Sequence, residues 1–352
     1  MIFKLINAGP RLSAGVVRLT AGVAILLYVA VYWKAGTFLP DFVSRDADKI
    51  QSQIGGSSTY QDTSFDAVAK FYASLGSVGT NLLVIGIGVL FIGLMIGYSR
   101  RAGGLAANVI LLAPCVFFNL FVASKDTLVV LMSIILVTVA RKGGLFWVMA
   151  AAAVLYLGYA LTVRIYFALI LAIAAAVWVF WAMSARLKTF AILAAVVALY
   201  LLPDIVYSIL LHPRDMAVDY LVAGSPYGAR TGFYNLYEPT SFTTFCADYV
   251  YAILKLNVPV LFYPGPKEFV MQVFVWIALS SVLDRRGSST ACRQAGAADV
   301  LASLVVGHIA VSMLFEPDLG SYIRHLSSVA LLGAWRVSCL ADGCRPGHFQ
   351  TS

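Results

Sequence analysis

The chain has 352 residues, of which 61% are hydrophobic and 12% are charged, and its mean hydropathy is +0.86. Soluble domains carry roughly 25% charged residues, so this composition excludes an ordinary soluble protein and predicts an all-α, polytopic membrane helix bundle. The net charge of +8 does not indicate nucleic-acid binding, because in a membrane protein the distribution of positive charge among the loops is what matters.

Apolar stretches of about membrane-spanning length recur along the whole chain, which we interpret as one transmembrane domain covering residues 1–352. A span needs about 20 mostly apolar residues. The predicted segments are 14–34, 81–98, 105–123, 127–140, 145–163, 165–183, 190–211, 268–283, 300–314 and 321–340. About ten transmembrane helices follow, separated by two longer polar stretches, 36–79 and 212–267.

The basic residues predict the orientation. With the N-terminus inside, Lys and Arg collect in the inner turns and give that side a charge of about +11, against about −3 outside. This distribution favours an even number of spans with both termini cytoplasmic, and it makes 36–79 and 212–267 periplasmic loops if the membrane is a bacterial inner membrane. Because the acids gather outside and no nucleotide-binding motif is present inside, we expect the active site on the outer face.

The first outer loop, residues 36–79, carries Asp41, Asp46 and Asp48 close together beside the membrane surface. A carboxylate held there could act as a general base or bind a divalent cation, although a merely solvated charged loop would look the same. The following residues 65–75 place Phe65, Val68, Phe71, Tyr72 and Leu75 on one helical face, which predicts an amphipathic helix at the interface.

A second polar group, Ser124-Lys125-Asp126, falls in the predicted outer turn between residues 123 and 127. Charges in so short a turn are costly unless they are paired. Either they anchor a helix end, or Asp126 is a second acid of the site and Lys125 contacts a phosphate.

The long outer loop, residues 212–267, contains aromatic and charged residues that suit a sugar or acceptor: Tyr227, Arg230, Tyr234, Tyr237 and Glu238. Sugar rings have apolar C–H faces that pack against aromatic rings. Aromatic residues are also expected at any membrane interface, so both interpretations stay open.

Arg324 and His325 lie about one turn inside the last apolar segment, shortly after Glu316 and Asp318. Ionisable residues at such a depth indicate a functional site. Arg324 could hold a phosphate and His325 could hydrogen-bond it or move a proton. The alternative is a structural pair between Arg324 and Glu316 or Asp318.

The stretches SRDADKI (residues 44–50) and SKD (124–126), with the acidic first outer loop and the many short-looped spans, resemble the GT-C superfamily of integral membrane glycosyltransferases. The stretches FYPGPKE (262–268) and SYIRH (321–325) are similar to bacterial surface-polysaccharide polymerases of the Wzy and EpsG type. The resemblance implies that Asp46 or Asp41 is the catalytic carboxylate, that Asp126 is the second-loop acid, and that Arg324 with His325 contacts the lipid phosphate.

The resemblance further implies a polyprenyl-(pyro)phosphate-linked sugar donor, a glycan or lipid-linked acceptor, membrane lipid around the protein, and in some members a divalent metal (Mg or Mn), for which Asp126 and Asp48 would be the ligands. Two other functions remain open. A transporter or lipid-linked sugar flippase would need charges along a path through the membrane, and a non-catalytic scaffold would need none of these residues for chemistry.

Overall fold

The computed structural model describes residues 6, 8–34, 41–54, 63–224, 230–283 and 295–341. These residues form fourteen α-helices and two short helical turns, and they contain no strand. The all-helical fold predicted from the composition is confirmed.

The first half of the chain forms seven helices and one five-residue π-helix, η1. They are α2 (Ala14–Tyr32), α4 (Asp41–Ile54), α5 (Thr63–Gly97), α6 (Ala102–Cys115), η1 (Val116–Leu120), α7 (Lys125–Lys142), α8 (Leu145–Thr162) and α9 (Tyr166–Ala182).

The second half forms seven more helices and a short 3₁₀ turn, η2. They are α10 (Ala185–Tyr200), α11 (Asp204–Gly224), α12 (Phe242–Asn257), η2 (Pro259–Leu261), α13 (Pro266–Leu283), α14 (Ala295–Phe315), α15 (Leu319–Ser328) and α16 (Ala330–Ala341).

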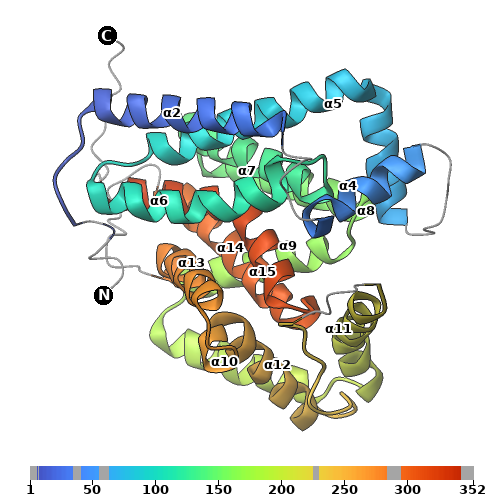
Figure 1. The fold of residues 1–352 in the computed structure, drawn as a ribbon. Helices are drawn as coiled ribbons and strands as arrows, with labels where there is room; N and C mark the ends of the chain where they lie inside the picture. Colours follow the sequence, from blue (N-terminus) through green and yellow to red (C-terminus); the bar gives the residue numbers. More distant parts are fainter. Residues whose placement is uncertain are drawn as a thin grey trace.

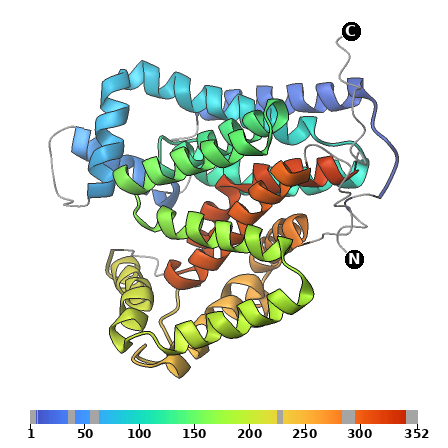
Figure 2. The ribbon, with the colours of Figure 1, turned by 180° about the vertical axis from the view of Figure 1, so that it is seen from behind.

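Helix α14 is the centre of the bundle. Fourteen of its 21 residues are buried, and it packs against α7, α8, α9, α11, α12, α13, α15 and α16. In both views α14 runs through the middle, with α2 and α5 on one side and α10 and α12 on the other (Figures 1 and 2). A helix that is apolar on all faces is stable in such a surrounded position.

Five helical segments in the described part of the chain are long and apolar enough to cross a membrane: α2, residues 65–97 of α5, α6 with η1, α8 and α14. A sixth results if α10 and α11, which are bent by 91° at their junction, form one span. Ten spans are therefore not confirmed. The predicted segment 321–340 is broken at Val329 into α15 and α16, and α7 carries two charged residues at each end.

The first outer loop of the prediction contains two helices, α4 and the first arm of α5. Helix α5 bends at Gly76, whose φ of 66° and ψ of 173° are favourable only for glycine, and the arm before the bend packs on α4 (Figure 1). The expected apolar face of this arm is buried at Phe65, Val68 and Tyr72, whereas Phe71 and Leu75 are exposed.

Candidate functional site

The first turn of α7 holds Asp126 in a well-defined place. Ser124 caps the helix, since its hydroxyl accepts from the Thr127 N–H at 3.2 Å while the Thr127 hydroxyl accepts from the Ser124 N–H at 3.1 Å. The Tyr72 hydroxyl of α5 donates to the Ser124 carbonyl at 2.9 Å. Asp126 therefore lies in the first turn of a capped helix, whose positive end favours a carboxylate.

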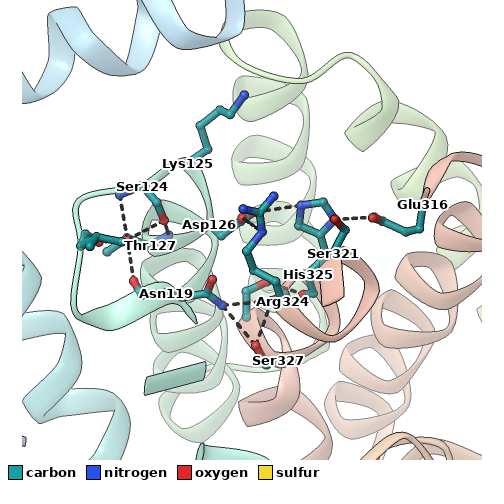
Figure 3. Close-up of polar contacts among 12 residues, drawn as sticks. Asn119, Ser124, Lys125, Asp126, Thr127, Glu316, Ser321, Arg324, His325 and Ser327 are labelled. Atoms are coloured by element: carbon teal, nitrogen blue, oxygen red, sulfur yellow. Dashed lines mark hydrogen bonds and ion pairs between the residues drawn. The ribbon is translucent and has the colours of Figure 1, made fainter. Parts of the chain in front are cut away.

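Three cationic or ionisable groups surround the Asp126 carboxylate, which is 1% exposed. Arg164 Nη1 lies 3.1 Å from Oδ1, Arg324 Nε lies 3.2 Å from Oδ2, and His325 Nε2 lies 3.5 Å from Oδ1. Figure 3 shows Arg324 and His325 approaching Asp126 from α15. The predicted neighbours Asp126, Arg324 and His325 thus form one cluster, although about 200 residues separate them in the sequence.

The electrostatics of this cluster favour an ionised Asp126. Burial by itself raises the pKa of this carboxyl, but the positive charges of His325, Arg164 and Arg324 outweigh burial and hold the pKa well below its ordinary value. A carboxylate with so low a pKa is a poor proton acceptor. Its role in the cluster is to hold the two guanidinium groups and the imidazole.

Glu316 orients His325 from the opposite side. Its carboxylate is hydrogen-bonded to His325 Nδ1 (Figure 3). His325 Nε2 lies 3.0 Å from Arg164 Nη1. Of the two alternatives for Arg324, the structural pair with Glu316 or Asp318 is not formed, because the ion pair of Arg324 within the described residues is with Asp126. Asp318 instead caps α15 by accepting from the Ser321 N–H at 2.9 Å.

Arg164 and Asn119 belong to the cluster and were not among the predicted site residues. Arg164 follows α8 at a short turn, where a single charge between two apolar stretches was the available sequence signal. Asn119 lies in the π-helix η1, and its side-chain amide donates to the Arg324 carbonyl at 3.0 Å and to the Ser327 hydroxyl at 3.2 Å. Single-turn π-helices are frequent at functional sites, but their sequence pattern is that of an ordinary helix.

A small cavity adjoins the cluster. Asp126, Arg164, Glu316 and His325 line one side of it, and His308 lines the part that lies along α14. Its free space holds about one water molecule. A sugar would therefore need the surrounding side chains to move.

Lys125 points away from Asp126 and His325 (Figure 3). Its ammonium group lies 3.3 Å from the centre of the Phe65 ring. The ammonium group of Lys49, on α4, approaches the same ring at 5.2 Å and the Tyr220 ring of α11 at 4.5 Å. The Phe65 ring therefore joins the start of α7 to α4, the helix that carries the predicted acids.

The acids of the first loop are placed only in part. Asp41, Asp46 and Asp48 all lie on α4, and the side chain of Asp48 is exposed. The side chains of Asp41 and Asp46 lie outside the described part of the structure, so their distance from Asp126 stays a prediction.

The predicted sugar-binding residues lie on the segment between α11 and α12, outside the Asp126 cavity. Arg230 is paired with Glu268 at 3.3 Å and is 66% exposed. Tyr234, Tyr237 and Glu238 are also exposed, and Tyr234 donates its hydroxyl hydrogen to Asp219 at 3.0 Å. Tyr227 lies outside the described residues.

This segment is nevertheless attached next to the cluster. The Phe233 N–H donates to the Pro317 carbonyl at 3.1 Å, one residue beyond Glu316. The fully buried Arg214 donates to Asn235 at 2.8 Å and also to the Met313 carbonyl. Arg214 was not among the predicted site residues. It lies in the middle of α11, the helix that continues past the predicted span end at residue 211.

Asp248 completes the support of the segment. Its carboxylate accepts from the backbone N–H groups of Leu236 and Tyr237, at 2.8 and 3.1 Å. Burial raises the pKa of Asp248, and these two hydrogen bonds and the charge of Arg214 oppose the rise. The exposed tyrosines are thus presented on a backbone that buried side chains hold in place.

The described residues of the cluster do not fit the divalent metal that the resemblance implies. Mg²⁺ and Mn²⁺ prefer carboxylate, carbonyl and water oxygens, whereas both Asp126 oxygens face guanidinium groups. Within the described part of the chain, no three His, Cys, Asp or Glu side chains lie close enough together to hold a metal ion.

No protein-family model, curated protein or solved structure matches the chain.

Proposed function

We propose that the chain is a membrane glycosyltransferase that uses a polyprenyl-(pyro)phosphate-linked sugar on the periplasmic side of a bacterial inner membrane, in the synthesis of a surface polysaccharide or glycolipid. The proposal includes about ten spans with both termini cytoplasmic. The observation that supports it best is the cluster of Asp126, Arg324 and His325: the sequence predicts all three for this chemistry, and Arg324 and His325 lie 3.2 and 3.5 Å from the Asp126 carboxylate.

The two arginines suit the phosphate of such a donor. A guanidinium group binds phosphate oxygens through parallel N–H donors and stays charged at every relevant pH. Arg324 is 25% exposed and Arg164 is 12% exposed, so Arg324 is the more accessible of the two. A donor phosphate would compete with Asp126 for these groups and would gain stabilisation as its negative charge grows during departure.

The acceptor hydroxyl needs a base. In the proposed mechanism the base is a carboxylate of α4, Asp46 or Asp41, and Asp126 serves to position Arg324 and His325. The acceptor would bind on the segment that carries Tyr234 and Tyr237, which is attached beside Glu316 through the Phe233–Pro317 hydrogen bond.

A binding experiment tests the donor class without knowledge of the sugar. Purified protein in detergent micelles is titrated with polyprenyl phosphate and, separately, with the uncharged polyprenol of equal length. We expect the phosphate to bind at least ten-fold more tightly, and Arg324→Gln to remove most of this preference. Arg186→Gln, at an exposed arginine of α10, is the matched control. Equal binding of the two lipids would refute the assignment.

Turnover is tested with a panel of polyprenyl-phosphate-linked sugars and glycan acceptors. Asp46→Ala is expected to abolish sugar transfer while the protein keeps its unfolding transition and its affinity for polyprenyl phosphate. Full transfer by a folded Asp46→Ala variant would exclude Asp46 as the base, and the same measurement on Asp41→Ala would then decide between the two acids.

One observation favours the transporter alternative. His308 lies in the apolar helix α14, its Nε2 is 2.8 Å from the Tyr156 hydroxyl, and it lines the same cavity as Asp126 and His325. Ionisable groups inside membrane-spanning segments are typical of proton pathways. Proteoliposomes that move a lipid-linked sugar without forming a glycosidic bond would support this function over the transferase.

A further inference from the structure

A second cavity lies at the end of the bundle opposite to the Asp126 cluster. Helix α7 runs from Lys125 to Lys142, a rise of roughly 26 Å. Its last turn carries Arg141, whose charge acts on the Tyr98 hydroxyl beside this cavity. The second cavity is therefore separated from the Asp126 cluster by about the length of α7.

The free space of this cavity, like that of the first, holds about one water molecule, so a headgroup would need the surrounding side chains to move. Its lining combines cations with polar and apolar groups. Tyr98, Arg100, Arg101 and Asn108 come from the turn between α5 and α6 and from α6 itself. Ala334, Val337 and Ser338 come from α16. No acidic residue is among the described lining residues, so an anion would meet positive charge on one wall and apolar side chains on another.

The backbone at this place is already hydrogen-bonded. The Ala102 and Gly103 N–H groups donate to the carbonyls of Pro10 and Ala8 at 3.2 and 3.1 Å, and the Leu12 N–H donates to the Arg100 carbonyl at 3.1 Å. An anion in the cavity would consequently be held by side chains rather than by the start of α6.

The Tyr98 hydroxyl is the strongest indication of a ligand. It is buried and makes no hydrogen bond of good geometry within the described residues, although the Arg141 side chain approaches it. A buried hydroxyl without a full hydrogen bond costs about 1–3 kcal/mol unless a ligand or water completes it. Burial raises the pKa of Tyr98 to about 12 in spite of Arg141, so the hydroxyl stays protonated and can donate to an anion.

The geometry points to an anionic phospholipid whose headgroup phosphate binds between Tyr98, Arg100 and Arg101. The position at the basic ends of the helices favours a lipid over a free phosphate, because basic pockets between membrane helices are a recurrent lipid-headgroup site. This inference is independent of the proposed transferase activity.

Native mass spectrometry of the intact chain tests it, after exchange into micelles that contain equal amounts of phosphatidylglycerol and phosphatidylcholine. We expect retention of phosphatidylglycerol but not of phosphatidylcholine, and no displacement by millimolar inorganic phosphate. Arg100→Gln with Arg101→Gln should reduce retention by about five-fold for each arginine removed. Arg18→Gln, at an exposed arginine of α2, should change nothing.

Tyr98→Phe provides a second variant that does not depend on Arg101, which also donates to the Gly9 carbonyl at 3.2 Å. It keeps the ring and removes the hydroxyl, and we expect a several-fold loss of retention. The inference is overturned if the two lipids are retained equally, if phosphate alone displaces the lipid, or if Tyr98→Phe binds like Arg18→Gln.

Discussion

Replacement of Asp126 by Asn is the sharpest test of the candidate site as a structural unit. The substitution keeps the shape of the side chain and removes the negative charge that faces Arg164 at 3.1 Å and Arg324 at 3.2 Å. Among the described residues of the cluster, the two guanidinium groups then have Glu316 as the remaining acid. Breaking a buried ion pair by removing one partner costs about 3–5 kcal/mol, and we expect a loss of this size.

Unfolding in mixed micelles, followed by circular dichroism, measures the loss. Asp66→Asn is the matched control, since Asp66 is exposed in the first turn of α5 and contributes about 0.3–1 kcal/mol through the helix end. Combining Asp126→Asn with Arg164→Gln removes one charge of each sign. The double variant should therefore be less destabilised than the sum of the two single variants.

The pH dependence adds an independent check. Because the pKa of Asp126 is held below its ordinary value, the stabilisation is fully present above about pH 4, the pKa of an unfolded aspartate, and is lost as pH falls further. The difference between wild type and Asp126→Asn should be constant at neutral pH and should shrink below about pH 4. A variant as stable as Asp66→Asn would refute the reasoning.

Substitutions at Gly76, Gly88 and Asp248 probe the fold, each with its own comparison. Gly76→Ala should destabilise the protein by about 1–2 kcal/mol, since φ is 66° at this bend. Gly86 lies in the straight part of α5 with open space around it, so Gly86→Ala should stabilise the protein by about 0.5–1 kcal/mol. Equal effects of the two substitutions in thermal unfolding would contradict the bend. Gly88→Ala should destabilise the protein by about 1–3 kcal/mol, because the new methyl group would meet the Tyr28 ring. The hydroxyl of this tyrosine donates to the Leu120 carbonyl at 2.8 Å. In a Tyr28→Ala background, Gly88→Ala should cause less destabilisation. Asp248→Ala should cost about 1–3 kcal/mol of stability by leaving two backbone N–H groups without an acceptor, and it should speed proteolysis at residues 230–241. Asp248→Asn retains an acceptor oxygen and should cost less. Unchanged cleavage in both variants would contradict the role of Asp248 in holding residues 230–241.

The amino-acid sequence by itself determined the structural class of the protein and identified several of the charged residues that form the candidate site. High apolar content and low charge are sufficient for an all-helical membrane-type bundle, because only helices satisfy the backbone of so apolar a chain within one segment. Asp126, Arg324 and His325 were identifiable for the same reason, since charge within apolar surroundings is costly and is kept where it is paired or used.

Tertiary structure alone decided how these groups are paired. The sequence suggested Glu316 or Asp318 as the partner of Arg324, because they are near in the chain. Packing of α15 against α7 places Asp126 beside Arg324 instead and leaves Glu316 to His325. The pairing of Arg164 with Asp126 and the helix break at Val329 could not be predicted from the sequence either. Ion pairs and helix breaks inside a bundle depend on which helix faces pack together, and local hydrophobic periodicity does not specify this.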